Sequence, residues 1–139
     1  MTHRVLRCGV GFAFMLLLSG CGTTNDKAPL KELQRTRSGE LDVVLLSEQD
    51  VLRQGRDSFV LEFRRADGSL IDVGEVRVNA SMAMAGMAPM FGGSETHTAD
   101  TKGRYTVNTD LGMAGSWRFV VDWNGEAGKG SASFSATIR

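Results

Sequence analysis

The sequence predicts an all-β fold, an immunoglobulin-like antiparallel β-sandwich of about seven strands. Apolar and polar residues alternate in several short stretches, which is the period of a strand with one buried face. Turn-forming residues separate these stretches. No stretch of helical period long enough to compete occurs after residue 20. Short alternating strands spaced by turns are typical of an antiparallel sandwich.

The clearest strand covers 58–64, where Phe59, Leu61 and Phe63 share one face and Glu62 and Arg64 take the other. Trp117, Phe119 and Trp123 form an aromatic stripe that we expect in the core rather than on a ligand-binding surface. The expected strands are 41–46, 58–64, 75–80, 94–98, 105–109, 117–123 and 132–138. The expected turns include 55–57, 66–68, 102–103 and 124–125.

The N-terminus resembles the leader of a bacterial lipoprotein. Arg4 and Arg7 precede an apolar run, 8–18, that is too short to span a membrane comfortably. The run ends at 18–21, Leu-Ser-Gly-Cys, which resembles a lipobox in which the cysteine is lipidated. We therefore expect Cys21 to carry the lipid and to begin the mature protein. An ordinary cleaved signal peptide followed by a chance cysteine is the alternative.

This N-terminus predicts the domain organisation and the location. We expect a lipoprotein signal peptide at 1–20, a flexible tether at 21–38 with a helical turn near 30–34, and a β-sandwich domain at 39–139. The lipid would hold the protein on a membrane of the cell envelope. Gly22, rather than Asp, follows Cys21, which in enterobacterial lipoproteins permits sorting to the outer membrane. In a Gram-negative host the domain would then face the periplasm.

Charge and sulfur content limit the partners of the mature chain. Removing Arg4 and Arg7 with the leader leaves 14 of the 16 Lys and Arg residues against all 16 Asp and Glu residues. A near-neutral, slightly acidic surface gives no reason to expect nucleic acid as a partner. Cys8 leaves with the leader and Cys21 is lipidated, so the folded domain has no thiol. Any soft sulfur ligand must therefore be methionine.

The sequence predicts a protein without catalytic activity. One histidine and no free cysteine remain in the mature chain, so no nucleophile–histidine arrangement is indicated. Asp100 and Asp110 are isolated turn residues without a paired carboxylate. No spacing typical of a zinc, calcium or phosphate site occurs.

The segment 81–93 is the one place where the sequence indicates chemistry. It contains four of the seven methionines, broken by glycine and proline, which predicts a loop carrying sulfur: Met82, Met84, Met87 and Met90. Thioethers are soft ligands suited to Cu(I), form no disulfides and have no proton to lose before binding. Met113 would join these ligands if its turn lies at the same end of the fold. His97, the only histidine of the mature chain, would be a further ligand.

Other interpretations of these residues stay open. Met82 and Met84 can equally fill one end of the core, because methionine is a flexible apolar side chain. The loop can also be an apolar docking surface, or a sink for oxidants through reversible sulfoxide formation. Met113 can pack beneath Trp117, and His97 can be an ordinary solvated loop histidine.

Three short motifs resemble the YtkA-like or FixH-like domain family, which pairs a methionine-rich loop with a later Met-x-Gly-x-Trp segment. They are MAGMAPM at 84–90, GRY at 103–105 and LGMAGSWRF at 111–119. The resemblance covers about 41–138 and implies a small β-sandwich that acts as an extracytoplasmic accessory domain. In this family such domains are sometimes linked to copper transport or to assembly of copper-containing oxidases. FixH-type proteins usually have a transmembrane anchor rather than a lipid, so the partners are expected to differ.

Two hypotheses of function result. In the first, a lipid-anchored accessory protein binds Cu(I) through the methionine loop and hands it to, or protects, an envelope partner such as a copper transporter or an oxidase-assembly protein. In the second, the domain is a structural or interaction module without metal, and the same loop is a core plug or a docking surface.

Overall fold

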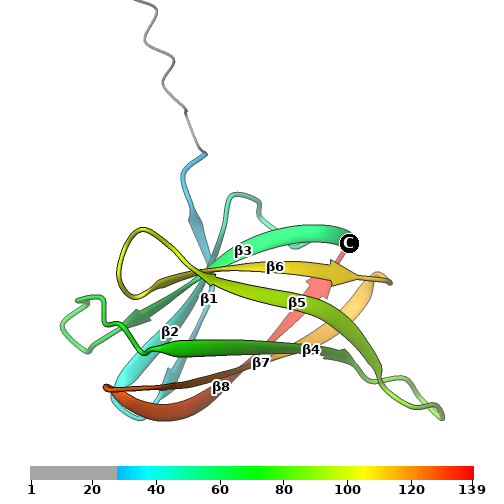
Figure 1. The fold of residues 1–139 in the computed structure, drawn as a ribbon. Coiled ribbons are helices and arrows are strands. Elements are labelled where there is room, and N and C mark those ends of the chain that lie inside the picture. The colour runs from blue at the N-terminus through cyan, green and yellow to red at the C-terminus, as the bar shows by residue number, and fades with distance from the viewer. Residues whose placement is uncertain (1–27) are drawn as a thin grey trace, which may run out of the picture.

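The computed structural model describes residues 28–139, which fold into eight antiparallel strands without a helix (Figure 1). The strands are β1 (Lys31–Ser38), β2 (Leu41–Ser47), β3 (Gly55–Arg64), β4 (Glu75–Met82), β5 (Met90–Thr98), β6 (Arg104–Leu111), β7 (Gly115–Gly125) and β8 (Gly128–Ile138). Nothing helical in these residues has the length and apolar character needed to cross a membrane. The predicted all-β antiparallel fold is confirmed, with eight strands instead of about seven.

The additional strand, β1, corrects the predicted tether. Residues 31–38 are neither a flexible linker nor a helical turn, because they pair with β2 from Lys31 opposite Ser47 to Ser38 opposite Leu41. Polar side chains hold this strand: Arg37 Nε donates to Asp42 Oδ1 of β2 at 2.8 Å. The predicted signal peptide, Cys21 and the tether residues 21–27 lie outside the described residues.

The strands form one curved sheet that wraps almost into a barrel, in the order β1-β2-β3-β6-β5-β4-β7-β8. Strand β5 joins its two halves. Residues 90–92 pair with β4, and from Gly93 onward the strand pairs with β6 instead. Gly92 lies at this change of partner, where an added Cβ would be 2.5 Å from Leu111 Cδ2. Only glycine fits there without displacing the core.

Side-chain hydroxyls close the gap between the two outermost strands. Ser38 Oγ of β1 donates to the Ser131 carbonyl of β8 at 2.8 Å, and Thr36 Oγ1 lies 3.5 Å from the Ser133 carbonyl. Unpaired edge strands invite association with other chains. Here each edge faces the other, so part of the β8 edge is covered from within the domain.

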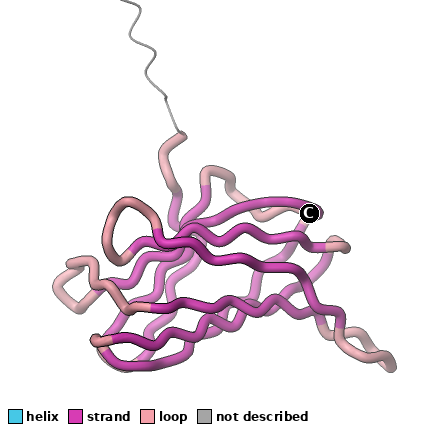
Figure 2. The backbone as a smooth tube through the Cα atoms, viewed as in Figure 1, coloured by secondary structure: helices cyan, strands magenta, loops and turns pink. Residues whose placement is uncertain are grey.

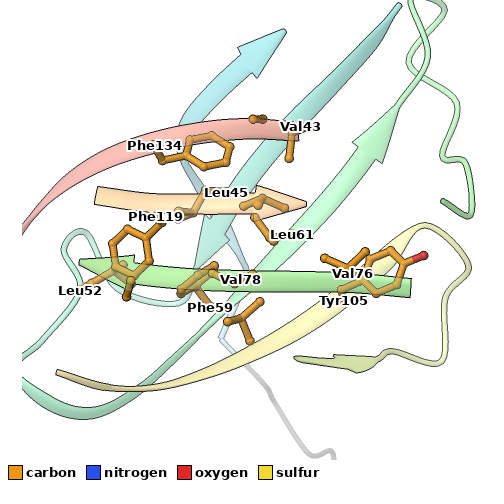
Figure 3. Packing of buried hydrophobic residues seen from close by; sticks show 14 of the residues in the cluster. Val43, Leu45, Leu52, Phe59, Leu61, Val76, Val78, Tyr105, Phe119 and Phe134 are labelled. Carbon is orange, nitrogen blue, oxygen red and sulfur yellow. The ribbon is translucent and has the colours of Figure 1, made fainter. Parts of the chain in front are cut away.

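The predicted inward-facing residues form one continuous core (Figure 3). Phe59 packs edge-to-face on Phe119, with ring centroids 5.6 Å apart, and so joins the two halves of the barrel. The predicted aromatic stripe on β7 is buried. Residues 28–139 thus contain a continuous core of their own.

Two of the predicted turns are wrong. Residues 55–57 belong to β3, and 124–125 belong to β7, which turns at 126–127 instead. Gly125 is needed for a close backbone contact, since a Cβ there would be 2.5 Å from the Val73 carbonyl oxygen. The turn glycines at 66–68 and 102–103 lie where predicted.

The connections between strands gather at the two ends of the barrel (Figure 2). The methionine end, as we call it, carries the β2–β3 connection (48–54), the β4–β5 connection (83–89), the β6–β7 connection (112–114) and Arg139. The opposite end carries the β1–β2 turn (39–40), the β3–β4 connection (65–74), the β5–β6 connection (99–103) and the β7–β8 turn (126–127).

Candidate methionine site

Five methionines from two segments, the β4–β5 hairpin and the β6–β7 connection, lie at the methionine end. Met82 ends β4 and stands directly opposite Met90, which begins β5. Met84 and Met87 lie in the connection between them, which projects from the body of the barrel (Figure 1). Met113 lies in the short connection that leads into β7, the strand paired with β4. The turn of Met113 is therefore at the end at which the sequence hypothesis required it.

The exposure of these side chains is graded. Met82 is 8% exposed and belongs to the core, whereas Met87 is 64% and Met113 41% exposed. Met84 and Met90 are partly buried and pack against the same core. The cluster therefore has a buried base, two intermediate members and two solvent-facing members.

Met82 is buried because it continues the inward-facing alternation of β4 from Val76, Val78 and Ala80. Its sulfur packs against Gly115, where an added Cβ would lie 2.9 Å from Sδ. Gly115 also has φ 141°, a conformation that favours glycine. A residue larger than glycine would displace this sulfur.

The projecting loop reverses at Gly86, which has φ 75°. The backbone N–H of Met87 donates to the Met84 carbonyl at 3.2 Å, which forms a turn between the two residues. This local bond is the one backbone hydrogen bond found inside the loop. Met87 therefore stands at the tip, away from the core.

The β6–β7 connection is held by side chains from the body of the barrel. Trp117, fully buried in β7, donates its indole N–H to the Met113 carbonyl at 2.9 Å. Gln54 Nε2 donates to the carbonyl of Gly112 at 3.0 Å. Trp117 thus fixes the backbone of Met113, whereas the Met113 side chain is exposed.

His97 is not part of the cluster. It lies on β5 opposite Thr106, seven residues beyond Met90 and therefore about 23 Å along the strand. Its exposed ring is 3.8 Å from the Glu95 carboxylate on the same strand. The structure places the five methionines at one end of the barrel and His97 farther along β5, toward the opposite end.

Within residues 28–139, His, Cys, Asp and Glu nowhere form a group of three or more that could hold a metal ion. The segment 81–94 contains no charged side chain. This segment therefore offers thioethers without a charged side chain of its own, a donor type that favours a soft monovalent cation over a hard divalent one.

Sequence reasoning missed two residues of this end. Phe91 is 74% exposed, because it follows Met90 in β5 and so points to the outer face. Strand alternation from Met90 would have predicted this orientation. The contact of Trp117 with the Met113 carbonyl depends on the path of a loop, and no sequence pattern reports it.

A family model described as YtkA-like matches residues 35–122, from β1 into β7, and so includes the five methionines and His97. A comparison with curated proteins found no match. The matched region is more than half of the chain and contains most of the strands described above. The chain belongs to the YtkA-like family.

Proposed function

We propose that this protein is a lipid-anchored, non-catalytic accessory protein of the cell envelope that binds Cu(I) at the methionine end and passes it to a partner. A copper transporter or an oxidase-assembly protein would be such a partner. The observation that carries the proposal is that five methionines, four from the β4–β5 hairpin and one from the β6–β7 connection, lie at one end of the barrel.

The exposure of the side chains assigns their roles in this proposal. Met84, Met87, Met90 and Met113 reach solvent and would supply the ligands. Met82 packs against Gly115 and would form the wall beneath them. Cu(I) is the cargo, and soft thioethers retain it without a proton having to leave.

Transfer to a partner requires a ligand that the partner can reach. Met87 stands at the tip of the projecting loop, which has few bonds of its own. A docking partner could take over the ion there while the buried part of the cluster stays in place.

A second candidate function is supported by Phe91 and Met87, which are both largely exposed. Together with the uncharged loop they make an apolar surface suited to docking a protein without any metal. A Met87→Leu substitution would preserve such docking, because leucine keeps the apolar volume, whereas Met87→Glu would abolish it.

An anaerobic Cu(I) competition titration against a chromophoric chelator tests the proposal on residues 26–139. A variant with leucine at all four ligand positions should lose binding and keep its fold. Met82→Leu and His97→Ala are the matched controls and should bind as the wild type does. A folded wild-type domain that does not compete for Cu(I) would overturn the proposal and favour the docking surface.

The anchor is tested separately in the full chain. Cells fed a labelled fatty acid should label the wild-type protein and not Cys21→Ala, and fractionation should then release the variant from the membrane. Labelling that persists in the variant, or an unlabelled wild type, would contradict lipid anchoring without affecting the copper proposal.

A further inference from the structure

The opposite end of the barrel contains a cavity of about 820 Å³. It lies between the β1–β2 turn, the β3–β4 connection and the β7–β8 turn. Its volume is within the range of about 300–1,000 Å³ typical of sites for small molecules, which often occur in the mouths of β-barrels.

The base of this cavity is the end of the hydrophobic core. Leu41 and Ile71 are partly buried and pack against the core, and both line the cavity. Trp123 is 6% exposed and also lines it. The Trp123 ring packs on Phe63, with centroids 5.2 Å apart, and covers Gly130, where a Cβ would be 2.4 Å from the ring. The aromatic wall is therefore held in one position.

The indole N–H of Trp123 is a donor open to the cavity. No acceptor for it occurs among residues 28–139, whereas the indole N–H of Trp117 is bonded to Met113. Gln49 Oε1 is the one buried side-chain polar atom without a partner in that part of the chain, so the Trp123 N–H is reached by solvent. Since Trp123 lines the cavity, a molecule bound there can take the place of that solvent.

Two cations of the rim are also without an acidic partner among the described residues. Arg65 and Lys129 line the cavity and form no ion pair in that part of the chain. Glu40, on the β1–β2 turn, is an opposing charge at the rim.

The other two charged groups of the rim are already occupied. Arg37 is paired with Asp42 at 2.8 Å. The Asp67 carboxylate accepts hydrogen bonds from the backbone N–H and the hydroxyl of Ser69, at 2.9 and 2.6 Å. These bonds lower the pKa of Asp67, with the hydroxyl as the larger cause. The rim groups that remain without a partner are therefore mostly hydrogen-bond donors, namely Arg65, Lys129 and the Trp123 indole.

We propose that this cavity binds an amphiphilic anion. The apolar or aromatic body of the ligand would lie on Leu41, Ile71 and Trp123, and its carboxylate or phosphate would accept from Arg65, Lys129 and the Trp123 indole N–H. Charge-assisted hydrogen bonds of this kind are the strong ones. A free organic acid and the head group of a membrane lipid both have this chemistry.

Nuclear magnetic resonance of residues 26–139 tests the proposal, with decanoate as the probe and decanol as its uncharged counterpart. The chain has two tryptophans and hence two indole N–H signals. Decanoate should shift the Trp123 signal and leave that of Trp117, about 20 Å away along β7, unchanged. Decanol should shift neither at the same concentration.

Three variants identify the contacts. Arg65→Gln and Lys129→Gln should each weaken decanoate binding about tenfold, because each removes a charge-assisted partner. Glu40→Gln should strengthen binding, because it removes the opposing charge. The Trp117 signal reports the fold in every variant. The control Arg56→Gln, an exposed residue on β3 outside the cavity, should bind as the wild type does.

Vesicles of anionic phospholipid separate the two sources of the ligand. Broadening of the Trp123 signal by vesicles and not by decanoate, lost in the Arg65 and Lys129 variants, would identify a lipid head group. A Trp123 signal that responds to neither probe, or equally to decanoate and decanol, would overturn the proposal. None of these results depends on copper.

Discussion

Glu62 Oε1 accepts a hydrogen bond from Arg104 Nε at 2.6 Å, and the carboxylate has no exposed surface although it is on the outer face of β3. Arg64, on the same strand, donates its Nε to Oε2 at 2.7 Å. Two guanidinium groups thus enclose one carboxylate on the outside of the barrel. In such an arrangement each buried charge has a partner, but removing either the carboxylate or an arginine leaves an unpaired charge and destabilises the folded protein.

Replacement of Glu62 should therefore destabilise the domain. We expect Glu62→Gln to lower the free energy of unfolding by about 2 kcal/mol or more, because the two arginines would remain packed over position 62 without a negative charge to pair with. Urea denaturation measures this change. Asp110→Asn is the matched control, since Asp110 pairs with Arg56 at 3.8 Å on the exposed surface, and it should cost less than about 0.5 kcal/mol. Equal effects of the two substitutions would contradict the burial argument.

Gly92→Ala should be destabilising, whereas its neighbour Gly93→Ala should be tolerated. A Cβ at position 92 would be 2.5 Å from Leu111 and 3.1 Å from Trp117, so we expect a loss of about 1–3 kcal/mol from overpacking. A Cβ at 93 would be 3.6 Å from Asp110, an ordinary contact. Thermal and urea unfolding of the two variants measure the difference. Similar stabilities would show that the core at the change of β5 partner can adjust.

The single tyrosine should make the domain less stable in alkali. Burial raises the pKa of Tyr105, and its hydrogen bond to Asp72 Oδ1 at 2.9 Å raises it further. The folded state therefore holds this proton more tightly than the unfolded chain. Its contribution to stability is complete below about pH 10 and is lost as the pH rises through the folded pKa.

Tyr105→Phe isolates this contribution. The variant should be less stable by about 1 kcal/mol at neutral pH, since it loses the bond to Asp72 and the one from the Val73 N–H. The difference between the variant and the wild type should shrink above pH 10. Urea denaturation as a function of pH measures it, and a constant difference would contradict the raised pKa.

Oxidation by hydrogen peroxide should follow the exposure of the methionines. Met87 and Met113 should become sulfoxides first, and Met82 should react only when the domain unfolds. Peptide mass spectrometry over time measures the order. Denatured protein is the control and should oxidise at all positions together. Early oxidation of Met82 in the folded domain would show that its sulfur is reached through a motion that the static structure does not contain.

Much of the fold follows from local sequence patterns, and the exceptions have physical causes. The strands with one apolar face were predictable, because alternation reports burial on one side directly. Strand β1 was not, since only Leu33 packs against the main core and its pairing with β2 depends on Arg37 and Asp42. The burial of Glu62 depends likewise on an arginine 42 residues away in sequence.

The site was predictable in composition but only partly in arrangement. Residues in one hairpin, such as Met82 and Met90, are kept together by the chain itself. Met113 lies at the same end because the β6–β7 connection passes from one half of the sheet to the other there. His97 lies elsewhere because of the length of β5. The small separation in sequence between His97 and Met90 was therefore a poor guide to their separation in space. An extended strand adds about 3.3 Å with every residue.

Because residues 31–38 belong to the sheet, the linker between the domain and a lipid anchor is shorter than the sequence predicts. Only residues 21–30 would separate a lipid on Cys21 from the first residue of β1, and ten residues span at most about 36 Å even when fully extended. A chain free as far as residue 38 would nearly double that distance. A partner that receives a ligand from such an anchored domain must then lie close to the membrane surface, because the linker that ends where β1 begins limits how far the domain can move away.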